Sequence, residues 1–207
     1  MTSAECLSAY RNGVSESIQY MGSAFVKNPD GSFQYNEKHR AFIVDAAFLK
    51  FYISWETFLE SIFISFLMGE NTIIGTTVPK CITARDEHHA ENILIGTNTY
   101  FDWTNPESVR KLSKLFLEDE NTIGNNVLAI QTELFDLKTI RNAAAHITST
   151  TQTKLDSVAS KLLNHQQTNT TVSDLIVKNM PGTSHTIFEY YQILLDSIAE
   201  SICKGSK

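Results

Sequence analysis

The chain has 207 residues and a net charge of −6, and 42% of its residues are hydrophobic and 19% charged. This is an ordinary globular composition, which excludes a disordered or collagen-like chain. The length is sufficient for one sizeable hydrophobic core, so we expect a single domain over residues 1–207. A protein that coats nucleic acid non-specifically usually carries a positive net charge, so any contact with nucleic acid must come from a local basic patch.

The three cysteines, Cys6, Cys81 and Cys203, are widely separated and odd in number. This favours free thiols in a reducing cytosol over a disulfide framework or a zinc knuckle. The first ten residues have no basic start and no apolar run, so we expect no signal peptide. The most apolar stretch, residues 41–69, carries charged side chains that are costly in a bilayer, and we interpret it as a buried helix of a cytoplasmic protein without membrane contact.

Apolar residues at steps of three and four predict helices over residues 4–25 and 37–68. Between them, the turn-forming residues 28–31 end the first helix. The second helix is apolar nearly all round: Phe42 and Ile53 belong to a stripe at near-helical spacing, and further aromatic residues fill its other faces. A helix of this kind is either central to a core or shared with a partner subunit.

A shorter helix is predicted over residues 83–94. Asn105 then has the character of an N-cap, with Pro106 at the first helical position of the next helix. We expect a turn at residues 121–126 and one continuous helix over residues 127–145.

The Thr- and Ser-rich residues 148–153 are expected to interrupt the helical pattern, which resumes over residues 154–164. Residues 175–177 fit either a helix or a strand, and a last helix is predicted over residues 184–203. The pattern therefore predicts an all-α bundle with one long central helix and irregular loops, one of which has room for a short hairpin.

A group of polar side chains at the end of the 127–145 helix has the chemistry for a catalytic site. Asn142 and His146 are four residues apart and share a helix face, Arg141 lies beside that face, and Lys138 precedes Arg141 by three residues. Histidine exchanges a proton near neutral pH, and a guanidinium holds a phosphate through paired hydrogen bonds. The alternative that the spacing leaves open is a histidine at a helix end beside a solvated arginine.

Three segments together resemble the HEPN superfamily, and their order is most like its RiboL-PSP-HEPN branch of bacterial toxin and defence ribonucleases. The first is residues 134–146, in which Arg141 and Asn142 precede His146 as in the motif of that superfamily. The others are Ser-Trp-Glu-Thr-Phe-Leu-Glu at 54–60 and Phe-Asp-Trp-Thr-Asn-Pro-Glu-Ser-Val at 101–109. The resemblance covers roughly residues 37–202.

The resemblance implies a HEPN-type helical bundle that acts as a metal-independent endoribonuclease without a cofactor. It implies a symmetric homodimer that binds RNA, with His146 as general acid or base, Arg141 as phosphate clamp and Asn142 as an orienting group. The expected product carries a 2′,3′-cyclic phosphate, and an antitoxin or regulatory protein is an expected partner. Some HEPN toxins carry a Tyr that their antitoxin modifies, but this chain has Thr148 at that position, which counts against such a restraint.

Four basic residues are candidate RNA contacts: Lys138, Arg110, Lys111 and Lys114. The last three cluster within one turn of the helix after Asn105. They have two interpretations, because they are placed either to guide RNA or to balance the acidic residues 118–119.

Other polar and aromatic residues favour structural roles. Glu56 and Glu60 are expected on a solvated helix stripe, with a position facing a cleft or a basic partner as the alternative. Trp55 and Trp103 are interpreted as core anchors, with base stacking as the alternative. Neighbouring histidines in residues 86–89 diverge on a helix and do not converge on one metal ion.

The alternative function is a non-catalytic helical module of HEPN type. Such a module would dock a partner protein of a defence or toxin–antitoxin system, and the Arg141–His146 segment would be a relic or a dimer contact. The acidic net charge and the large apolar helix are consistent with this function as well.

Overall fold

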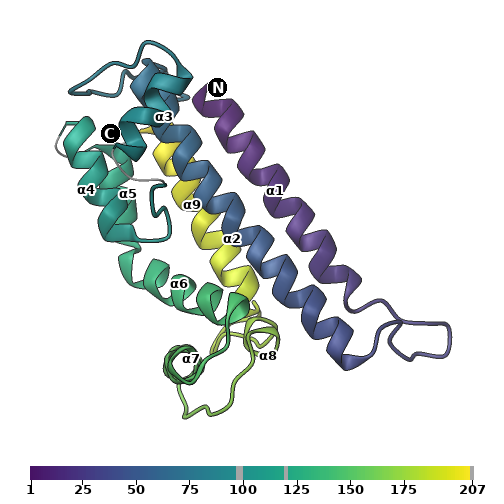
Figure 1. The fold of residues 1–207 in the computed structure, drawn as a ribbon. Coiled ribbons are helices and arrows are strands. Elements are labelled where there is room, and N and C mark those ends of the chain that lie inside the picture. Colours follow the sequence, from purple (N-terminus) through teal and green to yellow (C-terminus); the bar gives the residue numbers. More distant parts are fainter. Residues whose placement is uncertain (97–99, 119–120, 206–207) are drawn as a thin grey trace. The chain divides into compact units, whose positions relative to one another are not determined.

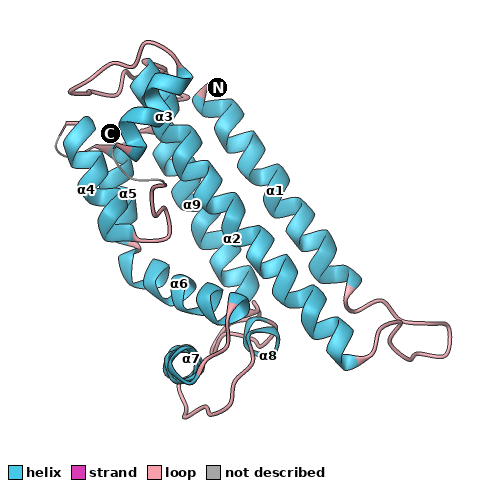
Figure 2. Cartoon of the chain, in the orientation of Figure 1, coloured by secondary structure: helices cyan, strands magenta, loops and turns pink. Residues whose placement is uncertain are grey.

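The computed structural model describes residues 1–96, 100–118 and 121–205. Within these ranges the chain forms nine α-helices and no strand, which confirms the predicted all-α class (Figure 1, Figure 2). The helices are α1 (Ser3–Ser23), α2 (Glu37–Met68), α3 (Glu87–Ile95), α4 (Pro106–Phe116), α5 (Thr122–Ala129), α6 (Gln131–Ala145), α7 (Ser149–Leu163), α8 (Val172–Ile176) and α9 (Ile187–Lys204). Isolated bridges, such as Lys27 with Phe33, occur only in loops.

Three predicted helix boundaries, both ends of α2 and the start of α4, are confirmed at the residue level. Helix α2 runs over Glu37–Met68 as predicted. Helix α4 begins at Pro106, and the Asn105 side chain accepts hydrogen bonds from the backbone N–H groups of Glu107 and Ser108. The start of α4 follows from local chemistry, since an N-cap and an N-terminal proline act on the first turn alone.

The prediction of a turn at residues 121–126 is wrong. Asn121 is instead the N-cap of α5, and its Oδ1 accepts a hydrogen bond from the Gly124 N–H at 2.8 Å. The predicted continuous helix over 127–145 is also wrong, because α5 ends at Ala129 and α6 begins at Gln131. Asparagine serves turns and helix caps through the same side-chain hydrogen bonds, which explains the error.

The predicted interruption at residues 148–153 is wrong for a similar reason. Thr148 is the N-cap of α7, and its hydroxyl accepts a hydrogen bond from the Thr151 N–H at 3.2 Å. Helix α7 therefore begins at Ser149, several residues before the predicted start. Residues 172–176 form the short helix α8. The segment 175–177, which fitted either a helix or a strand, therefore lies at the end of a helix.

The chain divides into two compact units. Unit 1 contains residues 1–11, 55–135 and 195–207, and unit 2 contains residues 12–54 and 136–194. Helices α1, α2, α6 and α9 contribute residues to both units. A single domain over the whole chain stays a prediction, and each unit is described by itself.

The core of unit 1 is built on aromatic rings. Trp55 is 1% exposed, and its ring centroid lies 6.1 Å from that of Tyr10 and 5.6 Å from that of Phe58. Trp103 is also buried, with its ring 6.0 Å from that of Phe63. The two tryptophans are therefore core residues, as their structural interpretation predicted.

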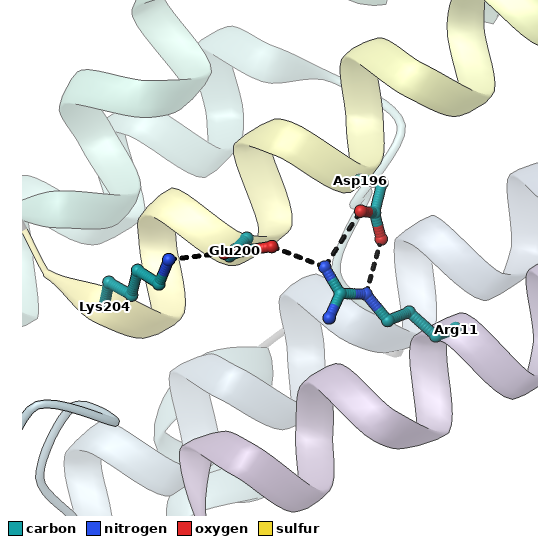
Figure 3. Close-up of polar contacts among 4 residues, drawn as sticks. All are labelled: Arg11, Asp196, Glu200 and Lys204. Carbon is teal, nitrogen blue, oxygen red and sulfur yellow. Dashed lines mark hydrogen bonds and ion pairs between the residues drawn. The ribbon is translucent and has the colours of Figure 1, made fainter.

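A polar network joins α1 to α9 within unit 1 (Figure 3). Arg11 pairs with Asp196 at 2.7 Å and with Glu200 at 2.6 Å, and Lys204 pairs with Glu200 from the other side. The Arg11 side chain is 44% exposed, so each pair contributes about 0–1 kcal/mol. The network fixes the register of the two helices more than it adds stability.

Two buried thiols belong to the same pair of helices. Burial raises the pKa of Cys6 to about 11 and that of Cys203 to about 12. Both therefore remain protonated thiols at neutral pH, which makes them poor nucleophiles.

Unit 2 packs one face of α2 inward. Phe48 and Phe51 are fully buried, and the Phe51 ring lies 5.3 Å from that of Phe188 on α9. Phe42 and Ile53 are 73% and 51% exposed, so part of the apolar surface of α2 lies outside the core of unit 2. On a helix that is apolar nearly all round, spacing identifies several stripes but does not say which one meets the core.

Helix α2 also meets α1 closely in unit 2. A Cβ added at Gly13 would lie 2.4 Å from the Ser54 hydroxyl oxygen, so only glycine fits without a local shift. Among the described residues, α2 is the one helix whose length and composition would allow it to cross a membrane. Its most apolar window is 61% buried within the protein, which is also typical of the core helix of a soluble protein.

Asp45 is a half-buried carboxyl on α2, and its Oδ1 has no hydrogen-bond partner among the described residues. The pKa of Asp45 is raised to about 6, mainly by burial; the Ser173 backbone N–H opposes the rise, and the Asp174 charge adds to it. The folded chain therefore binds this proton more tightly than the unfolded chain, whose aspartates titrate near about 3.9.

We expect Asp45 to make the fold less stable as the pH rises from about 4 to about 6, by on the order of 1–3 kcal/mol. Asp45→Asn removes the charge, so this variant should be more stable than the native chain at pH 7.5. The difference between the two should shrink as the pH falls to about 4. Urea titrations of both proteins at each pH measure it, and a constant difference would contradict this origin.

Candidate functional site

The C-terminal half of α6 is held in unit 2 by its apolar face. Leu137, Ile140 and Ala143 follow at steps of three and are all buried. On the same helix, buried Asp136 pairs with Lys161 of α7 at 2.6 Å. These contacts fix the orientation of α6 about its own axis. The side chains between the buried positions therefore lie on the outer side of the helix.

Arg141 and Asn142 occupy that outer side, and both are half-buried. The Arg141 Nη1 donates a hydrogen bond to the Asn142 Oδ1 at 3.3 Å, so the amide orients the guanidinium. No carboxylate pairs with Arg141 in the described parts of the chain, which leaves most of its five donors for an outside acceptor. Lys138, one turn earlier, is half-buried.

His146 follows the last residue of α6, and its backbone is fixed on both sides. Its N–H donates to the Asn142 carbonyl at 2.9 Å, and its carbonyl accepts from the Thr151 hydroxyl at 2.9 Å. The side chain is exposed, and none of the described residues hydrogen-bonds to the imidazole ring. Hydrogen bonds thus hold the backbone of His146 in place, and its imidazole ring is available to a ligand.

The capping box of α7 is the part of this site that sequence reasoning missed. Thr148 and Thr151 cap each other reciprocally, and Thr151 also holds the His146 carbonyl. The usual signature of a capping box places Glu or Gln at the third helical position, whereas this chain has Thr there. The Thr-x-x-Thr spacing was the available signal.

The other candidate RNA contacts lie on α4, in unit 1. Arg110 is half-buried and donates a hydrogen bond to Gln131 Oε1 at 2.9 Å, so one of its donors is already used. Lys111 and Lys114 are exposed. Within the described ranges no ion pair joins these cations to Glu118, and Asp119 lies outside those ranges.

The remaining polar candidates are the histidines of residues 86–89 and the two glutamates of α2. His88 lies 3.6 Å from Glu91, whereas the His89 ring accepts a hydrogen bond from the Arg85 N–H. In the described part of the chain, no three His, Cys, Asp or Glu side chains come together to hold a metal ion. Glu56 and Glu60 are half-buried and not fully solvated as expected.

Comparison with protein families, with curated proteins and with solved structures finds no match for this chain. The assignment of a function therefore rests on the side chains of the site.

Proposed function

We propose that this chain is a metal-independent endoribonuclease of a toxin or antiviral defence system, acting in the cytoplasm. The observation that supports it is the end of α6, where an exposed imidazole follows an arginine that has no carboxylate partner among the described residues. An always-charged guanidinium and a side chain that can take and give a proton are the two groups that RNA cleavage needs.

The chemistry uses the nucleophile that RNA carries. His146 takes the proton of a 2′-hydroxyl, and the 2′-oxygen attacks the adjacent phosphorus. Arg141 binds the non-bridging oxygens and offsets the charge that builds on them, while Asn142 orients the guanidinium. The bond from phosphorus to the 5′-oxygen breaks, and that oxygen gains a proton, so the products are a 2′,3′-cyclic phosphate and a 5′-hydroxyl.

A second chain would complete the site. The motif of one chain supplies one histidine, whereas the reaction needs a base for the 2′-hydroxyl and an acid for the leaving oxygen. A homodimer that brings two copies of His146 to one phosphate would supply both groups. The exposed Lys111 and Lys114 remain proposed contacts to the RNA backbone.

A second candidate function is a docking module for a partner protein of the same kind of system. Phe42 and Ile147 favour it, because they expose 73% and 68% of their surface. An antitoxin or regulatory protein covering such residues is compatible with the nuclease as well. The two functions differ in whether RNA is cut.

Cleavage in the absence of divalent metal tests the proposal. The purified chain should cut a labelled RNA in excess EDTA at the rate seen without EDTA, because no step uses a metal ion. Mass spectrometry of the products should show 2′,3′-cyclic phosphate ends. Loss of cleavage in EDTA, with recovery on adding Mg²⁺, would contradict the mechanism.

A further inference from the structure

Unit 2 contains a cavity that the cleavage mechanism does not use. Its volume is about 470 Å³, and its walls come from the loop after α1, the first turns of α2, and α8 with its flanking residues. Sites for small ligands are roughly 300–1,000 Å³ and combine apolar walls with a few polar groups. This cavity has both the size and the mixed lining.

Arg40 is the polar group that most needs a partner in this cavity. Its guanidinium carbon lies 4.0 Å from the centre of the Phe33 ring, so stacking holds the side chain in place. Its Nε is buried without a hydrogen-bond acceptor, and no carboxylate pairs with it among the described residues. A charged group with an unmatched buried donor is costly, and an oxyanion in the cavity that Arg40 lines would balance the charge of its guanidinium.

The other lining groups restrict the ligand further. Lys38 adds a second cation without an ion pair in the described ranges, whereas Glu37 and Asp174 bring two carboxylates to the same cavity. A simple anion would meet repulsion from these acids, and an apolar ligand would leave all four charges unmatched. The lining therefore fits a ligand that carries an anionic group together with N–H or O–H donors.

An aromatic ring gives this ligand a flat surface. Phe25 lines the cavity, is 38% exposed, and meets Phe33 edge-on with ring centres 6.3 Å apart. A T-shaped contact with Phe33 covers at most one face of the Phe25 ring, and nucleobases stack on aromatic faces.

We propose that this cavity binds one nucleotide unit. Its phosphate lies on Arg40 and Lys38, its base stacks on Phe25, and base or ribose donors reach Glu37 and Asp174. A free mononucleotide and one residue of an RNA strand share this chemistry. The inference does not require that the chain cleaves RNA.

Calorimetric titration of the full chain tests this site. The probes are AMP, CMP, GMP and UMP, a 2′-O-methyl RNA hexamer that resists cleavage, and adenosine and inorganic phosphate as partial ligands. At least one mononucleotide or the hexamer should bind at least ten-fold more tightly than either partial ligand. Arg40→Gln should weaken that binding at least ten-fold, whereas Arg85→Gln, which removes an exposed arginine of unit 1, should leave it unchanged.

The outcomes separate the two sources and decide the proposal. Tighter binding of a mononucleotide identifies a free nucleotide as the ligand, and tighter binding of the hexamer identifies RNA. If Arg40→Gln does not fold, the exposed Lys38→Gln replaces it and should weaken binding at least three-fold. The proposal is overturned if no nucleotide probe binds, if inorganic phosphate binds as well as the nucleotides, or if folded variants bind like the native chain.

Discussion

His146→Ala is expected to lower the rate of RNA cleavage by at least about 100-fold, because it removes the group that takes the 2′-hydroxyl proton. Arg141→Ala is expected to cost roughly 100- to 1,000-fold, since the charge on the phosphate then builds without its guanidinium. Initial rates on a labelled RNA, measured with purified native and variant chains, check both values. Toxicity in cells should disappear with the same two substitutions.

The controls keep these substitutions informative. The His146 side chain is exposed and Arg141 is half-buried, so both variants should fold with the circular dichroism spectrum of the native chain. His185→Ala removes another exposed histidine of unit 2 and should leave the rate unchanged. Cleavage at the native rate in both His146→Ala and Arg141→Ala would refute their assigned roles.

Trp55→Ala is expected to reduce the free energy of unfolding by about 3–5 kcal/mol, because it empties a fully buried site between Tyr10 and Phe58. A typical domain is stable by about 5–15 kcal/mol, so this loss is large enough to unfold part of the population near 37 °C. Urea denaturation followed by circular dichroism measures the change.

Phe42→Ala is the matched control for Trp55→Ala on the same helix. Phe42 is 73% exposed, so its removal should change the free energy of unfolding by less than about 0.5 kcal/mol. An equal effect of the two substitutions would mean that the aromatic rings of α2 do not divide into a buried set and an exposed set. Unchanged stability in Trp55→Ala would restore the base-stacking alternative for this residue.

The sequence was most informative where one local interaction determines the structure. Pro106 and Asn105 define the start of α4 by themselves. The predicted start of the preceding helix at residue 83 is wrong, because Asp86 is the N-cap and α3 begins at Glu87. Prediction failed where one residue type is common in two kinds of structure. Asn121 is typical of a turn, but here it is the N-cap of α5. Spacing also could not tell that Phe42 is exposed, because the exposed face of an almost wholly apolar helix is decided by neighbours that are distant in sequence.

The candidate site also has features that the sequence could predict and features that it could not. Spacing could predict that Arg141 and Asn142 lie together near the end of α6, because residues along one helix keep fixed relative positions, whereas His146 lies just after the last residue of that helix. The bond from Thr151 to the His146 carbonyl depends on a cap that has an unusual residue at its third position. The cavity beside Arg40 joins α2 to residues near 173, and no local pattern signals an association over that distance in the sequence.

Sequencing RNA ends after brief expression in cells tests the role of the α6 motif most directly. The native chain should create new 5′-hydroxyl ends at reproducible sites within minutes, and His146→Ala, expressed at an equal level, should create none of them. The same new ends in both samples would contradict the account, as would a native sample indistinguishable from cells without the protein.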